Sequence, residues 1–174
     1  AINTFSPVKA EPKATKIIDD WGAATEFNFV LTAGTNTAAG DIATPMPDGA
    51  VTDEETGAVS VTATATKACS TVSFGEIEFV KEGVYNYTIK EIDDGVGGIT
   101  YDPNTHKVVI EVKKDGDNKL SAVVKYDGEE AEAISITNSL ESKIASIQAT
   151  KEINDWGTAT EFNFVLTAGT NTAA

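Results

Sequence analysis

The chain has 174 residues, of which 41% are hydrophobic, and carries a formal net charge of −14 at pH 7. This length is enough for one domain with its own core plus shorter segments. The acidic surface argues against nucleic acid and anionic membranes as partners, because both would repel it. No run of about 18 apolar residues is present, so we expect no membrane insertion in this segment.

Taken in chain order, the predicted elements are strands separated by turns. Apolar and polar residues alternate with a period of two, and valine, threonine and isoleucine supply much of the apolar content. We predict strands at 14–19, 26–32, 58–66, 73–80, 84–92, 107–114, 119–126 and 132–140. Residues 33–57 form the least regular stretch and are expected to be a long loop or an irregular edge strand. About eight strands without intervening helices predict an all-β, immunoglobulin-like antiparallel β-sandwich.

A long internal repeat sets the expected domain organisation. Residues 149–174 repeat residues 14–39 with only three substitutions, at an offset of 135 residues (149 − 14). A repeat of this length is a whole domain with its linker. We therefore expect a tandem array in which 14–140 is the complete module. On the same offset, 1–13 would be the closing strand of a preceding repeat plus a linker, 141–148 a linker, and 149–174 the opening strands of the next repeat.

Three polar residues occupy the apolar faces of their predicted strands. Ile17 becomes Glu152 in the second copy, so its face must be solvated and the alternate face, with Lys16, must point inward. By the same alternation, Glu91 and Asn138 continue apolar faces of their own strands. Burying one unpaired charge costs several kcal/mol, so these residues need partners or water.

Two interpretations of these three residues remain open. In the first, Lys16 and Glu91 form a buried ion pair beside Asn138, or each residue sits at a strand end and reaches water by snorkelling. The second is covalent, because burial favours a neutral, nucleophilic lysine amine and a protonated glutamate. Attack by Lys16 Nζ on Asn138 Cγ would expel ammonia and leave an amide cross-link. Glu91 would act as the proton shuttle and would donate a hydrogen bond to the carboxamide oxygen.

The ordered motifs of the chain resemble those of the streptococcal pilin isopeptide-linkage domain. They are SFGEI at 73–77, GVYNYTIKE at 83–91, GITYD at 98–102 and ITNS at 136–139. The resemblance covers 14–140 and begins again at 149. It implies an immunoglobulin-like module of Gram-positive pilus shafts and surface adhesins. In that family a lysine of the first strand is joined to an asparagine of the last with the help of a glutamate, which implies the same three residues.

Further expectations follow from this resemblance. Lys151 would bond to an asparagine of the next repeat, and Asn3 to a lysine of the preceding one. The chain would be a structural repeat of an extracellular, cell-surface filament, inextensible and protease resistant. Its partners would be neighbouring repeats or copies of the same protein. We expect no cofactor, no metal and no turnover enzyme activity beyond the single autocatalytic reaction.

The alternative function is a ligand-binding, adhesive module without a cross-link. A site for a host-surface ligand would then lie in the loop at 33–57 or the turn at 93–103.

Two isolated residues receive simpler interpretations. Cys69, the only cysteine, is expected to be a small buried hydrophobe, and His106, the only histidine, a surface residue without a partner for catalysis.

Overall fold

The computed structural model describes residues 6–172, and every regular element within that range is a β-strand. These residues include no helix long and apolar enough to cross a membrane. The chain divides into two compact units between Glu141 and Ser142. The strands, all in the first unit, are β1 Val8–Ala10, β2 Lys13–Ile17, β3 Glu26–Asn36, β4 Val51–Thr52, β5 Val59–Thr66, β6 Thr71–Ser73, β7 Ile77–Phe79, β8 Gly83–Glu91, β9 Ile99–Thr100, β10 Thr105–Lys114, β11 Leu120–Tyr126, β12 Glu129–Glu130, β13 Ile134–Thr137 and β14 Ser139–Leu140.

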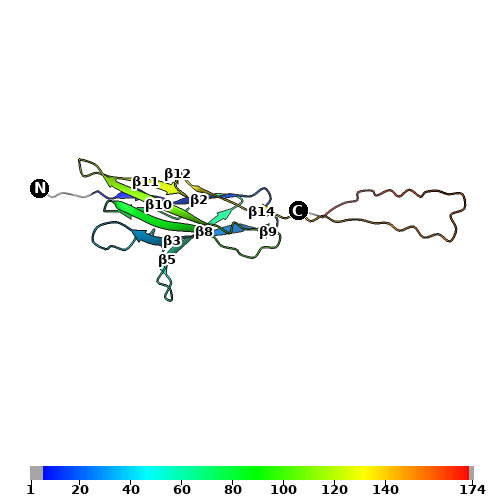
Figure 1. The fold of residues 1–174 in the computed structure, drawn as a ribbon, viewed down its shortest axis with the longest axis horizontal. Helices are drawn as coiled ribbons and strands as arrows, with labels where there is room; N and C mark the ends of the chain where they lie inside the picture. The colour runs from blue at the N-terminus through cyan, green and yellow to red at the C-terminus, as the bar shows by residue number, and fades with distance from the viewer. Residues whose placement is uncertain (1–5, 173–174) are drawn as a thin grey trace. The chain divides into compact units, whose positions relative to one another are not determined.

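A seven-stranded antiparallel sheet forms one layer of the first unit (Figure 1). Its strand order is β12-β11-β10-β8-β3-β5-β4. The side chains of each central strand alternate between buried and more exposed, as the period-two pattern predicts. The buried set places aromatic and branched side chains on one face of the sheet. It includes Phe27, Phe29, Leu31, Tyr85, Tyr87, Ile89, Val108 and Ile110.

The strands that cover this face are shorter. They form a three-stranded sheet of order β13-β2-β6 and a two-stranded sheet of β1 and β7. The first and last long strands of this layer, β2 and β13, pair in parallel, with Lys16 opposite Ile136. The sandwich is therefore antiparallel except at this pair. Strands from near the start and near the end of the unit are therefore neighbours and run in the same direction.

Two predicted strands are interrupted where the chain must change direction. The strand expected at 73–80 is divided into β6 and β7 around Gly75, whose φ of 102° favours glycine. The strand expected at 132–140 is divided into β13 and β14 around Asn138. Residues 8–10, which we expected in a linker, instead form β1 and pair with β7. The other strands missed from the sequence are two residues long, too short to show an alternation.

The second unit shows which features of the repeat form locally. Gly157 N donates to Asp155 Oδ1 over 2.9 Å, as Gly22 N does to Asp20 Oδ1 in the first copy. Trp156 packs on the ring of Phe162 at 4.8 Å between centroids, matching the 4.8 Å between Trp21 and Phe27. No strand is assigned in the described part of this unit, 142–172. The turn thus forms from local sequence, whereas the strands require partners.

Candidate functional site

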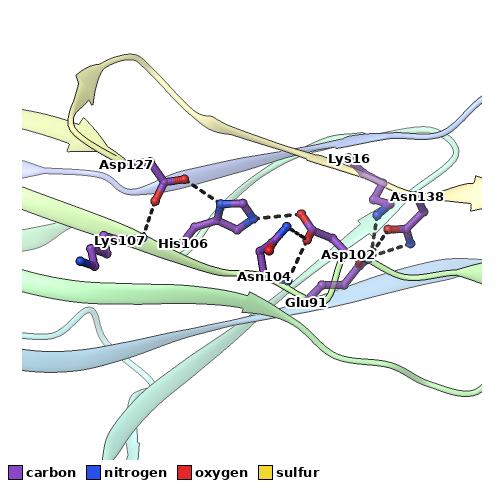
Figure 2. A network of polar contacts seen from close by, with 8 residues as sticks. All are labelled: Lys16, Glu91, Asp102, Asn104, His106, Lys107, Asp127 and Asn138. Atoms are coloured by element: carbon purple, nitrogen blue, oxygen red, sulfur yellow. Dashed lines mark hydrogen bonds and ion pairs between the residues drawn. The ribbon is translucent and has the colours of Figure 1, made fainter.

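The three polar residues singled out from the sequence meet inside the sandwich (Figure 2). Lys16 comes from β2, Glu91 from the end of β8, and Asn138 from the break between β13 and β14. Their relative exposures are 4%, 3% and 4%, and the side chains of Lys16 and Glu91 are fully buried. The facing inferred from the two copies is confirmed, since Ile17 is 43% exposed. Snorkelling to water is excluded by this burial.

Glu91 lies between the other two side chains. Its Oε1 accepts a hydrogen bond from Lys16 Nζ at 2.6 Å and another from Asn138 Nδ2 at 2.9 Å. One carboxylate oxygen therefore contacts both a nucleophilic nitrogen and the nitrogen that would leave as ammonia. This arrangement allows a proton to pass between the two nitrogens without crossing open solvent.

Aromatic rings surround the lysine amine. Lys16 Nζ lies 4.7 Å from the centroid of the Phe27 ring and 5.8 Å from that of Phe29. Desolvation in this apolar site lowers the pKa of Lys16, although the hydrogen bond and charge of Glu91 act in the opposite direction. The lysine is thus more easily deprotonated than a surface lysine, which is the property that a nucleophilic amine requires.

The carboxamide of Asn138 is oriented differently from our expectation. Its oxygen does not face Glu91; Oδ1 accepts a hydrogen bond from the backbone N–H of Asp102 at 3.0 Å. A backbone N–H can only donate, so the carboxamide must present its oxygen on this side and its NH2 group to Glu91. The same N–H lies 3.1 Å from Glu91 Oε2. The expected hydrogen bond from the glutamate to the carboxamide oxygen is therefore replaced by one from the backbone.

His106 is not the isolated surface residue that we expected. Its side chain is only 12% exposed and bridges two aspartates: Nε2 lies 3.0 Å from Asp102 Oδ2, and Nδ1 lies 2.8 Å from Asp127 Oδ2. Partial burial lowers the pKa of His106, but the hydrogen bonds to Asp127 and Asp102 outweigh it and hold the pKa above its ordinary value. The period-two pattern could have predicted that His106 points inward, because His106 shares the inward face of β10 with Val108.

The remaining single residues are placed as follows. Lys151 is exposed in the second unit, with its Nζ 4.9 Å from the centroid of the Phe162 ring. Asn3 lies outside the described residues. Cys69 is exposed rather than buried, because it lies in the turn between β5 and β6. The prediction of a buried hydrophobe was therefore wrong.

The segments proposed for ligand binding prove to be partly ordered by their own contacts. Strand β3 extends to Asn36, whose Nδ2 donates to Ile42 O at 2.9 Å and to Thr44 Oγ1 at 3.0 Å. These contacts close the loop after β3 on itself. In the described range, 6–172, no three acidic, histidine or cysteine side chains are arranged to hold a metal ion.

Comparisons with known proteins found one matching family and several solved structures. The family model described as FctA, the Spy0128-like isopeptide containing domain, matches residues 12–141. A crystal structure of the major pilin from Streptococcus pyogenes aligns at 21% identity with a TM-score of 0.40, covering 79% of this chain and 52% of the pilin. The structure of a major pilin protein of a Streptococcus pyogenes serotype aligns at 19% identity and a TM-score of 0.42, covering 76% and 52%. The chain thus spans about half the length of these solved pilins. Among curated proteins, no sequence matches it.

Proposed function

The chain belongs to the Spy0128-like isopeptide containing domain family, and we propose that its first unit is a force-bearing module of an extracellular Gram-positive pilus or surface filament. The module is locked by a self-formed isopeptide bond between Lys16 and Asn138. One observation carries the proposal: the buried Glu91 Oε1 contacts Lys16 Nζ at 2.6 Å and Asn138 Nδ2 at 2.9 Å.

The contacts support a reaction in which Lys16 is the nucleophile, Asn138 is the acyl group and Glu91 carries the protons. Proton transfer from Lys16 to Glu91 leaves a neutral amine, whose lone pair attacks Asn138 Cγ while the carbonyl π electrons move to Oδ1. Glu91 then gives its proton to Nδ2 and accepts one from Nζ. The oxyanion collapses, the Cγ–Nδ2 bond breaks, and ammonia leaves. Proximity in the folded state drives this single turnover, which consumes no cofactor.

The pairing of β2 with β13 gives the bond a mechanical role. Lys16 lies in β2, the second strand of the unit, and Asn138 lies between β13 and β14, its last two strands. Tension would pass through the amide, and the 121 residues between them (138 − 16 − 1) would carry little load. Neighbouring repeats or further copies of the same protein would transmit this tension along a filament.

Pulling the full chain from its two ends tests this role. The parent chain should show no extension from unfolding of the segment between Lys16 and Asn138. A Glu91→Gln variant keeps the shape of the side chain but loses the proton shuttle, and it should release about 400 Å when that segment unfolds. A Glu78→Gln variant, altered at an exposed glutamate of β7, is the matched control and should behave as the parent does. Equal extension of the parent and the Glu91→Gln variant would refute the proposal.

A further inference from the structure

The contacts around Asp102 point to a component of the reaction that the three reacting side chains do not supply. Attack on Asn138 Cγ places negative charge on Oδ1, and a buried oxyanion without a donor would be very costly. Glu91 Oε1 accepts hydrogen bonds from Lys16 Nζ and from Asn138 Nδ2, and neither Lys16 nor Glu91 hydrogen-bonds to Oδ1 in this structure. The donor to that oxygen is the backbone N–H of Asp102, at 3.0 Å.

On the basis of the proposed cross-linking reaction, we propose that the Asp102 N–H is the oxyanion donor for bond formation and that His106 is the positioning residue that fixes it. The distance of 3.0 Å lies within the range of donors that stabilise acyl-transfer oxyanions. The N–H is already aimed at Oδ1 before reaction, so no reorganisation is needed when the charge develops.

A bridge of side chains holds the peptide group of Asp102 in place (Figure 2). Asp102 Oδ1 accepts hydrogen bonds from Asn104 N at 2.8 Å and from Asn104 Nδ2 at 2.7 Å, and its Oδ2 contacts His106 Nε2. The other ring nitrogen contacts Asp127, whose Oδ1 accepts a hydrogen bond from Lys107 N at 2.7 Å. The loop before β10 is thereby tied to the turn after β11.

The protonation state of His106 should control this bridge. Both ring nitrogens face carboxylate oxygens, so only the imidazolium form donates to Asp102 and Asp127 together. Charged residues adjoin His106 on both sides: Lys107 follows it on β10, and Lys90 of β8 is paired with Thr105. His106 itself is paired with the uncharged Ile89 of β8, and beyond Asp102 lies the pair of Lys16 and Glu91.

Proton transfer from Lys16 to Glu91 converts the charged pair to the neutral pair without exchanging a proton with solvent, so this step adds no pH dependence of its own. An imidazole changes its charge near neutrality, and His106 is the histidine tied to the oxyanion donor through Asp102. We expect the rate of bond formation to fall as pH rises through the pKa of His106.

The first test removes the Asp102 N–H, and with it the hydrogen bonds to Asn138 Oδ1 and to Glu91 Oε2, without changing any side chain. The full chain is prepared and kept in denaturant, refolded by dilution, and sampled over time for loss of ammonia by intact mass. Replacing Asp102 by its α-hydroxy acid turns the peptide N–H into an ester oxygen and keeps the side chain. This should slow cross-linking by about 10²- to 10³-fold. The same replacement at Asn118, whose N–H donates to Asp115 O in a remote turn, is the control and should leave the rate unchanged.

The second test does not depend on folding of the ester. A His106→Gln variant should cross-link about 10- to 100-fold more slowly than the parent below about pH 6, because the peptide group is less firmly held. It should also lose the pH dependence that the parent shows. An Asp102 ester that reacts at the parental rate, or a His106→Gln variant with the parental pH profile, overturns the inference and leaves the cross-link intact. A parent chain that never loses ammonia overturns the cross-link as well.

Discussion

Replacing Lys16 and Glu91 by neutral groups of similar size should lower the free energy of unfolding if a covalent bond joins Lys16 to Asn138. The same replacement should leave that free energy unchanged or raise it if only an ion pair is present. We consider the double variant Lys16→Met/Glu91→Gln. The methionine takes the place of the lysine side chain beside the rings of Phe27 and Phe29, and sulfur packs well against aromatic rings. The single oxygen of the new amide at position 91 can accept a hydrogen bond from Asn138 Nδ2 or from the backbone N–H of Asp102, which in the parent contact separate oxygens of Glu91. The variant therefore removes the two charges and the nucleophile with little change of volume.

The magnitude follows from the loop that the bond closes. Lys16 and Asn138 enclose 121 residues (138 − 16 − 1). In the chain-entropy treatment of cross-links, such a loop stabilises the folded state by about 5 kcal/mol, so we expect the double variant to lose about that amount of unfolding free energy. If only an ion pair were present, replacing both partners by neutral groups would be neutral or would stabilise the protein by about 1–4 kcal/mol.

The assay is guanidinium chloride unfolding followed by the fluorescence of Trp21, on a Trp156→Phe background that removes the second tryptophan. Trp21 reports on the core because it packs on Phe27 at 4.8 Å. The control variant Lys125→Met/Glu111→Gln removes a partly exposed pair with an Nζ to Oε1 distance of 2.9 Å, and it should change stability by about 0–1 kcal/mol. A Lys16→Met/Glu91→Gln variant as stable as the parent, or more stable, would rule out a covalent bond between Lys16 and Asn138.

Three further predictions concern residues outside the reacting pair. The raised pKa of His106, in which the hydrogen bonds to its two aspartates outweigh desolvation, adds stability that is fully present below about pH 6.5 and is lost as pH rises through the folded-state pKa. His106→Gln should flatten this part of the profile of urea midpoints, and an unchanged profile would contradict the assignment. Exposed Cys69 should react with a thiol reagent in the native protein without a lag, whereas a requirement for denaturant would contradict its placement. Gly75→Ala should destabilise the domain by about 1–3 kcal/mol in the same unfolding assay, because φ at Gly75 is 102° and an added Cβ would lie 2.9 Å from Pro47; a change near zero would show that the turn adapts.

The side chains at the centre of the site were predictable because strand periodicity records which way a side chain points. Lys16, Glu91 and Asn138 each appeared as a polar residue on an apolar face, and the structure places all three in the core. The proposed role of Asp102 as oxyanion donor could not be predicted from the sequence, because its contribution is a backbone N–H that every residue except proline has. His106 was readable from its inward position, but its two aspartates come from separate loops and cannot be paired from sequence.

The strands themselves show where local sequence stops being sufficient. Residues 26–36 and 161–171 have identical sequences, yet the first segment forms β3 and the second forms no strand. In the first unit β5 and β8 flank β3 on both sides, and these partners come from distant parts of the chain. Periodicity therefore predicts which residues can form a strand and which face is buried, whereas pairing decides whether the strand forms and how long it is.

Mass spectrometry of the denatured protein shows whether Lys16 is bonded to Asn138. We expect an intact mass lower by one ammonia and, after proteolysis, a branched peptide in which Lys16 Nζ is joined to Asn138 Cγ. An Asn138→Ala variant should keep its full mass. A parent protein at full mass, with the peptides containing Lys16 and Asn138 recovered separately, would show that no bond forms and that Lys16 and Glu91 are a buried ion pair.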